Sequence, residues 1–516
     1  MLFNSFPFLF IYLPIVLLGY QIAGHLHRRG VVLWLGISSL AFYAYWHPPF
    51  LLVLITSISL NYFFSCLISR RIHNGVDTRA WLWLAITGNL GALCYFKYLF
   101  PLLGFLASVA HSGHDWGRVL LPLGISFFTF TQIAYLVDLQ QGVASVQDFP
   151  SYLLFVSFFP HLIAGPILHH KDIMPQFQQQ RDYRLSLDDL AVGFSWFIMG
   201  LFKKVMLADT FGLFADPVFA MPGKAPVGYA WLGVLSYAMQ LYFDFSGYSD
   251  MALGLARMFS IQFPLNFSSP YKAVNIIDFW NRWHMTLTQY ITSYVFTPVQ
   301  KEIIEWRQKR GQKVSRKALA TPSGFIQLIA LPTLFTMGLV GVWHGAGIQY
   351  ILFGLLHGLY IVTTHGWRIL RTNWDPIPDW IGARVRHVFS VGLTFLAVVV
   401  GQVFFRSTNT HSALVLLRQM VSFHATATTG GMGAHGITRG WALIPVGFFI
   451  VWFMPNTQQM LSNFRPALAL SSWDLKPALI RLFWQPSGAW SIILSIALMT
   501  SLVHFQDPST FLYFQF

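Results

Sequence analysis

Long apolar runs separated by short polar segments are the feature that most constrains the fold of this 516-residue chain. The first four predicted spans cover residues 6–24, 31–46, 50–68 and 81–100. A run of about 20 apolar residues can cross the hydrocarbon core of a bilayer as a helix. We therefore predict an all-α, polytopic membrane helix bundle of roughly 10–12 membrane segments, re-entrant helices included, built as one domain over residues 1–516.

Composition supports a membrane protein and argues against several other classes. Hydrophobic residues make up 55% of the chain and charged residues only 10%, against roughly 25% charged residues in soluble proteins. The net charge of +14 is spread over loops between apolar runs, which predicts a topogenic role on the cytoplasmic side and no nucleic-acid partner. With two cysteines and no metal-ligand spacing among the histidines, we expect no metal site.

The later part of the chain alternates further apolar runs with polar segments. Predicted spans cover residues 190–214, 229–259, 348–368, 388–404, 442–454 and 490–503. Residues 158–166 are apolar but carry two prolines, which predicts a re-entrant segment buried in protein. Residues 301–317 form the most basic stretch and are predicted to be a cytoplasmic loop. One interpretation is that its positive charge keeps this loop on the cytoplasmic side of the membrane. The alternatives are that it attracts anionic lipid heads or the phosphates of a nucleotide-bearing donor.

A histidine flanked by glycines is the strongest candidate for chemistry. His344 lies in the sequence GVWHGAG, residues 341–347, between two long apolar runs. A titratable group at membrane depth is costly and marks a functional site, although histidines also join helices by hydrogen bonds. The glycines leave room for a ligand or another backbone, and Trp343 can stack on a planar group. We predict that His344 is the general base of an acyl transfer within the membrane.

A second candidate histidine lies in a segment predicted to be an amphipathic helix along the membrane interface. Asp278 and Arg282 are spaced to form an ion pair four residues apart. Asn281 and His284 are predicted to share a polar face with Thr288, opposite a face of tryptophans and aliphatic residues. We expect His284 to position or polarise the donor or the acceptor, with Asn281 and Asp278 contributing to substrate binding.

Other polar residues in apolar runs receive different weights. Asp244 and Ser246 are candidates to face a cavity and bind substrate, or to join helices by hydrogen bonds. Lys97 is expected to extend from the end of its span toward the interface. His357 follows His344 at a spacing that places it on a different helical face, so it receives less weight than His344.

Four motifs in this order along the chain resemble those of the membrane-bound O-acyltransferase (MBOAT) family. They are LPLGISFFTF (121–130), DFSGYSDMALGLARMF (244–259), DFWNRWHMTL (278–287) and GVWHGA (341–346). The likeness is greatest to the bacterial branch, which includes the membrane subunits that acetylate alginate, cellulose and peptidoglycan and the teichoic-acid D-alanyl transferase. The resemblance implies that His344 is the catalytic histidine, that His284 is the second histidine, and that both lie near a channel through the bundle.

The resemblance also implies a reaction and its partners. We expect transfer of an acetyl group from a cytoplasmic donor, acetyl-CoA, toward hydroxyls of an extracytoplasmic polysaccharide such as alginate, cellulose or another exopolysaccharide. No bound cofactor is expected. The expected partners are a periplasmic SGNH acetyltransferase similar to AlgJ or AlgX, a polymer synthase complex and membrane lipids, at the bacterial inner membrane. Residues 347–350 and the long basic stretch 301–317 differ from the alginate members, so the polymer stays open.

Two alternatives to this function remain. One is a transporter or flippase for lipid-linked sugars, which would more often show inverted repeats that this sequence lacks. The other is an MBOAT enzyme that acts on peptidoglycan, a lipid or a protein.

The C-terminal residues 511–516, FLYFQF, resemble an aromatic tail found in this branch. The simpler interpretation is an aromatic anchor at the membrane interface. The alternative is that Tyr513 is a covalent acyl carrier, because a phenyl ester lies between a thioester and an alkyl ester in transfer potential.

Overall fold

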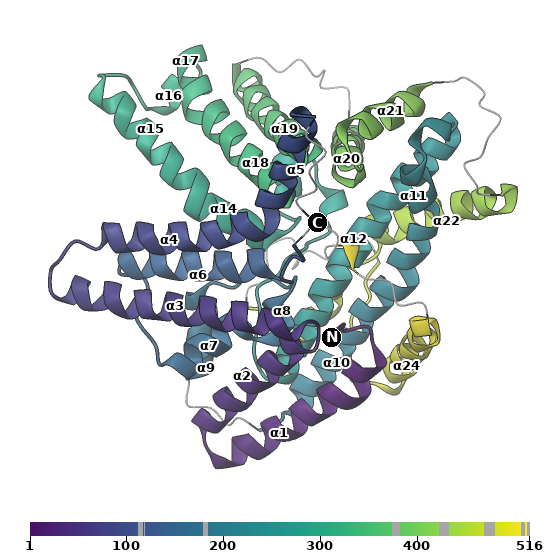
Figure 1. Ribbon diagram of the computed structural model, residues 1–516. Coiled ribbons are helices and arrows are strands. Elements are labelled where there is room, and N and C mark those ends of the chain that lie inside the picture. Colours follow the sequence, from purple (N-terminus) through teal and green to yellow (C-terminus); the bar gives the residue numbers. More distant parts are fainter. Residues whose placement is uncertain are drawn as a thin grey trace.

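The protein is helical throughout the part that the structure describes (Figure 1). The structure is a computed structural model that describes residues 1–111, 117, 119–178, 184–373, 382–422, 433–468, 480–506 and 511–512. Within these ranges there is no β-strand, only an isolated bridge between Phe267 and Trp283. The all-α prediction is therefore confirmed.

The first half of the chain contains eleven α-helices among the described residues. They are α1 (Leu13–Leu26), α2 (Arg28–Ala44), α3 (Pro48–His73), α4 (Arg79–Cys94), α5 (Phe100–Val109), α6 (Ile125–Gln140), α7 (Phe149–Ser157), α8 (Phe159–Leu162), α9 (His170–Gln178), α10 (Leu187–Phe202) and α11 (Asp209–Ala220).

The second half contains thirteen more within the described ranges. They are α12 (Val227–Met258), α13 (Ile276–Trp280), α14 (Met285–Ile291), α15 (Thr297–Lys309), α16 (Arg316–Leu319), α17 (Pro322–Phe325), α18 (Leu331–His344), α19 (Ile348–Asn373), α20 (Ala383–Arg406), α21 (Thr410–Val421), α22 (Ala434–Phe453), α23 (Thr457–Met460) and α24 (Gly488–Val503).

Seven helical stretches in the described residues are long and apolar enough to cross a membrane. They are Phe8–His25, Pro48–His73, Arg79–Val109, Leu187–Ala220, Pro322–His344, Ala383–Arg406 and Ala434–Phe453. The predicted number was larger for two reasons. It included shorter runs such as the apolar helix Gly488–Val503, and it included the predicted spans 229–259 and 348–368, which form the long helices α12 and α19 but are not among the seven.

Helix α12 is the centre of the bundle, and nearly all of its side chains are buried. It lies beside α10 and α11 in Figure 1. Glycines allow the close approach of α10: a Cβ on Gly200 would lie 2.6 Å from the carbonyl oxygen of Gly247, and one on Gly193 would lie 2.7 Å from that of Gly254. Small residues at helix contacts are how membrane helices bring their backbones together.

Helices α18 and α19 form an antiparallel pair that carries His344 at its turn. A Cβ on Gly341 would lie 2.3 Å from the carbonyl oxygen of Tyr350, and one on Gly354 would lie 2.1 Å from that of Met337. Gly341, which precedes His344, therefore makes room for another backbone, which is one of the two roles that the sequence predicted for the flanking glycines.

Three predicted segments differ in detail from the structure. The predicted loop 301–317 is helical in its first half, because α15 continues to Lys309. The predicted single helix from Asp278 is wrong, since the chain leaves helical geometry between α13 and α14. Residues 158–166 are buried and broken, with Phe158 between α7 and α8, as the prolines predicted.

Candidate active site

Three histidines from different segments line one small buried cavity, which we call the histidine chamber. His284 precedes α14, His344 ends α18, and His357 lies within α19. The cavity has a volume of about 40 Å³, room for about three water molecules. The remaining lining residues are Leu241, Asp244, Phe245, Phe279, Trp280, Trp283, Leu287, Phe353, Val398, Gln402, Phe405 and Leu512.

The sequence analysis was wrong to place His357 apart from His344. The helical period does not continue from one residue to the other, because α18 ends at His344 and the chain reverses into α19. His357 is 1% exposed, and neither of its ring nitrogens has a hydrogen-bond partner among the described residues. His357 therefore contributes two ring nitrogens without a hydrogen-bond partner to the wall of the chamber.

Hydrogen bonds from a neighbouring segment fix the C-terminal end of α18, where His344 lies. Lys97 donates a hydrogen bond to the carbonyl oxygen of Trp343, and Tyr98 donates one to that of Val342 at 2.8 Å. A cation at a helix C-terminus is favourable because carbonyl groups there have no partner within the helix. The expectation that Lys97 extends toward the interface is therefore wrong, since its amine turns inward to this helix end.

The His344 ring itself lies among aromatic rings. Its centroid is 4.6 Å from that of Trp343, 4.9 Å from Phe405 and 5.8 Å from Phe353. Trp343 stacks on Phe130 with centroids 5.7 Å apart, so a protein ring occupies one face of the indole. Trp343 is buried and is not among the residues lining the chamber, which gives it a packing role in this structure.

His284 occupies the turn between α13 and α14, with a positive φ of 45°. Its Nδ1 lies 3.0 Å from the amide oxygen of Asn266, and its Nε2 is buried without a hydrogen-bond partner in the described part of the chain. The edge of the ring meets Phe245, with centroids 4.8 Å apart. Asn266 was missed by the sequence analysis because it lies 18 residues before His284 in an irregular segment.

Asp278 and Asn281 lie near this turn but are not among the residues lining the histidine chamber. The predicted ion pair exists: Asp278 accepts a hydrogen bond from Arg282 Nε at 2.8 Å. Its other oxygen accepts the backbone N–H of Val274 at 3.1 Å, so the carboxylate fixes the turn. Asn281 is exposed and lines a neighbouring cavity. The structure therefore does not place these two with His344 and His284.

A wider cavity of about 500 Å³ adjoins the chamber at Trp280, which lines both. Its other lining residues are mostly polar or small: Asp172, Pro264, Leu265, Asn281, Met285, Thr288, Gln289, Thr292, Ser293 and Leu468. The indole Nε1 of Trp280 is buried and has no partner among the described residues. The chamber therefore has a larger, more polar neighbour on the side of Trp280.

Asp244 lines the chamber and belongs to a buried ion pair. Lys204 Nζ lies 2.7 Å from Asp244 Oδ1 and 2.7 Å from Asp209 Oδ1. Ser246 is buried on the same helix but does not line the chamber. The sequence signal for Lys204 is a basic pair, Lys203–Lys204, within the predicted span 190–214.

The C-terminal tail reaches the chamber at Leu512. Its backbone N–H donates a hydrogen bond to Asp244 Oδ2 at 3.1 Å, and its side chain lines the chamber. The preceding Phe511 is 1% exposed, with its ring 4.8 Å from that of Tyr248. Tyr513, a predicted catalytic residue, lies outside the described residues. The described residues contain no group of three or more His, Cys, Asp or Glu arranged to hold a metal ion.

Comparison with known proteins identifies the family. The family model for MBOAT, the membrane-bound O-acyltransferase family, matches residues 136–308. A peptidoglycan O-acetyltransferase of Helicobacter pylori is 37% identical over 83% of this chain and 81% of its own length. This chain belongs to the membrane-bound O-acyltransferase family. It is thus a multi-pass membrane protein and an O-acyltransferase.

Other members of the MBOAT family align over similar or greater lengths. The protein named probable alginate O-acetylase AlgI in Pseudomonas aeruginosa is 37% identical over 82% of this chain and 75% of its own length. The protein of the same name in Pseudomonas putida is 32% identical over the whole of both chains. The family model stops before His344, but these relatives extend the likeness across the histidine chamber.

Proposed function

We propose that this MBOAT enzyme transfers an acetyl group from cytoplasmic acetyl-CoA to a hydroxyl of an extracytoplasmic polysaccharide. The names of its relatives support the class of reaction, since they are O-acetylases of alginate or of peptidoglycan. The peptidoglycan O-acetyltransferase of Helicobacter pylori and the probable alginate O-acetylase of Pseudomonas aeruginosa are each 37% identical to the chain. Alginate, peptidoglycan and cellulose are therefore the polymers to test.

The histidine chamber is the observation that carries this proposal. In the reaction, the acceptor oxygen attacks the thioester carbonyl carbon, a C–O bond forms and the C–S bond breaks. The hydroxyl proton moves to an imidazole and from there to the departing sulfur. A small cavity with little room for water limits hydrolysis of the thioester, and an imidazole is suited to move this proton. As the sequence predicted, we assign the base to His344.

Tyr513 is proposed as an intermediate acyl carrier. The proposal is supported by the aromatic tail FLYFQF, residues 511–516, which resembles that of the bacterial branch, and by Leu512 of this tail, which lines the chamber. In the first step the C–S bond of the thioester breaks, a phenyl ester forms, and the phenol proton moves to the departing sulfur. In the second step the C–O bond between the acetyl carbon and the phenol oxygen breaks, the sugar ester forms, and the sugar hydroxyl proton returns to the phenol oxygen. An acyl intermediate divides one difficult transfer into two easier ones.

The proposed setting is the bacterial inner membrane. The basic segment that includes α15 would attract anionic lipid heads or the phosphates of acetyl-CoA. A periplasmic SGNH acetyltransferase similar to AlgJ or AlgX and a polymer synthase complex are the proposed protein partners. These assignments follow from the family and are tested by co-purification from membranes.

Replacement of His344 by Ala tests the central assignment. We expect loss of polymer acetylation by at least about 10²-fold, because the proton acceptor is removed. The measurement is the O-acetyl content of the polymer by mass spectrometry, with the amount of enzyme in the membrane measured in parallel. Normal acetylation by a fully accumulated His344→Ala enzyme would contradict the proposal.

A further inference from the structure

Asn266 makes a contact with His284 that determines which ring nitrogen of this histidine carries a hydrogen. Both residues are buried, at 1% and 2% exposure. The amide oxygen of Asn266 lies 3.0 Å from His284 Nδ1. An amide oxygen only accepts hydrogen bonds, so Nδ1 must be the protonated nitrogen if the orientation of the amide is fixed.

The surroundings of Asn266 do fix that orientation. Its Oδ1 accepts a second hydrogen bond from Thr286 Oγ1 at 3.0 Å, and the Thr286 hydroxyl in turn accepts the backbone N–H of Ile167 at 3.0 Å. Its Nδ2 donates to Ser249 Oγ at 3.2 Å. The backbone N–H of Thr286, which can only donate, also points to this Oδ1 at 3.4 Å. A reversed amide would place an NH₂ group against that donor, so the oxygen faces His284.

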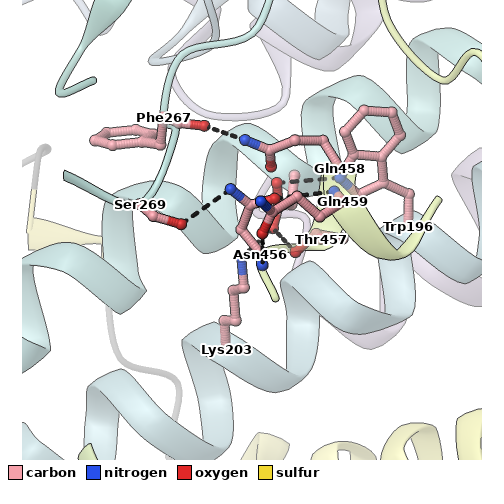
Figure 2. Close-up of polar contacts among 9 residues, drawn as sticks. Trp196, Lys203, Phe267, Ser269, Asn456, Thr457, Gln458 and Gln459 are labelled. Carbon is pink, nitrogen blue, oxygen red and sulfur yellow. Dashed lines mark hydrogen bonds and ion pairs between the residues drawn. The ribbon is translucent and has the colours of Figure 1, made fainter. Parts of the chain in front are cut away.

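The segment that carries Asn266 is held from both sides. Backbone hydrogen bonds join it to the turn of His284: Ser268 N–H donates to the Arg282 carbonyl, and Met285 N–H donates to the Asn266 carbonyl, both at 2.9 Å. Figure 2 shows the other side, where the side chains of Gln458 and Asn456 donate to Phe267 and Ser269.

The segment that includes Asn456 and Gln458 is itself fixed to the helix bundle. Thr457 donates a hydrogen bond to Asp250 at 2.7 Å, and Asp250 also accepts hydrogen bonds from Trp196 and Lys203. Figure 2 shows Trp196, Lys203 and Thr457 gathered beside Asn456. The position of Asn266 is thus built into the bundle, which is what a residue that orients a histidine requires.

We infer that Asn266 is a positioning residue that keeps His284 as a hydrogen-bond acceptor toward the acyl acceptor. With Nδ1–H donated to Asn266, neutral His284 has only the lone pair of Nε2 left for the chamber. It can accept the hydrogen of a hydroxyl but has no N–H with which to polarise a carbonyl. This selects one of the two roles that the sequence left open. A sugar offers several hydroxyls, so His344 and His284 can each receive one.

This inference rests on the proposed function and adds a pH dependence to it. The other titratable groups that line the chamber are His344, His357 and Asp244, and Asp244 is paired with Lys204. Protonation of His284 would remove its acceptor lone pair. Activity should therefore fall as the pH is lowered through the titration of this imidazole.

Two variants of Asn266 test the inference in membranes that contain the enzyme and its own polymer, with acetyl-CoA as donor and CoA release as the measurement. Asn266→Ala should lower the rate of transfer by about 10-fold or more and leave the KM for acetyl-CoA unchanged. Asn266→Asp should retain activity, and the acid limb of its pH profile should move to higher pH because a carboxylate favours the imidazolium. Asn89→Ala is the matched control, because it removes an amide that is hydrogen-bonded to Asn61 and the Ala85 carbonyl and does not line the chamber, and it should behave as wild type.

A double variant separates positioning from folding. His284→Ala with Asn266→Ala should be no slower than His284→Ala alone, because Asn266 acts through the histidine. Full additivity, or an Asn266→Asp profile that coincides with wild type, would overturn the inference. So would a raised KM for acetyl-CoA at unchanged kcat in Asn266→Ala. Wild-type membranes that release no CoA in the presence of polymer would instead contradict the proposed function.

Discussion

At the scale of single residues, the buried ammonium of Lys204 lies where two carboxylates neutralise it. Lys204 is 1% exposed and lies between Asp244 and Asp209, with its ammonium also over the ring of Phe511 at 5.0 Å. Removing one partner of a buried pair leaves the other charge uncompensated in a medium of low dielectric. The pair therefore links the stability of the bundle to the wall of the histidine chamber.

Lys204→Met tests this link. We expect the variant to lose about 3–5 kcal/mol of stability, because Asp244 stays buried without its cation. The midpoint of thermal unfolding of the detergent-solubilised enzyme is the measurement. Lys301→Met is the matched control, since Lys301 is exposed and 4.0 Å from its partner Glu305, and such pairs contribute little. Equal stability of the two variants would contradict the role of the buried pair.

At the scale of elements, glycines decide how closely helices approach. On α10, a Cβ at Gly200 would meet the Gly247 carbonyl oxygen at 2.6 Å and the Met251 nitrogen at 2.8 Å. These are backbone atoms of α12, the helix that also carries Asp244, so the helices must separate to accept a methyl group. The spacing of α10 and α12 thus affects the chamber.

Gly200→Ala should destabilise the protein by about 1–3 kcal/mol, which is typical of overpacking. Gly88→Ala on α4 is the control, because nothing lies within 4 Å of a Cβ there. Alanine at Gly88 should be neutral or stabilising by up to about 1 kcal/mol through helix propensity. Accumulation in the membrane and the unfolding midpoint distinguish them, and a Gly200→Ala enzyme as stable as Gly88→Ala would refute close packing.

At the scale of the whole molecule, one described residue near each end of the chain packs against the central helix α12. Tyr248 of α12 stacks on Phe3 at 5.0 Å and meets the edge of Phe511 at 4.8 Å. The structure describes the tail at Phe511 and Leu512. There, the tail is not a separate anchor at the membrane interface. Those two residues are built into the core beside the histidine chamber.

Tyr513→Phe tests whether this arrangement serves the carrier role. The variant keeps the aromatic ring but removes the hydroxyl that would hold the acetyl group, so polymer acetylation should be lost while the enzyme accumulates normally. Mass spectrometry of the C-terminal peptide should show an acetyl group on Tyr513 in the wild type. A Tyr513→Phe enzyme that acetylates its polymer normally would end the carrier proposal.

The sequence determined the class of fold and two of the site residues. Apolar runs can satisfy their backbone only as helices in lipid, which is why the all-α bundle was predictable. His344 and His284 were recognisable because a titratable ring in an apolar context is costly. The Asp278–Arg282 pair was predictable from its four-residue spacing, although it forms across the turn that follows α13 and not within one helix.

Tertiary structure decided which groups share the chamber. His357 joined it because α18 stops at His344 and α19 returns, so one helical period could not relate the two histidines. Asn266 lies 18 residues before His284. Lys97 and Leu512 lie 247 and 168 residues from His344 in the sequence. Sequence pattern carries no geometric information over such separations. Local sequence fixes the period of an element, but only packing decides which side chains from different elements meet.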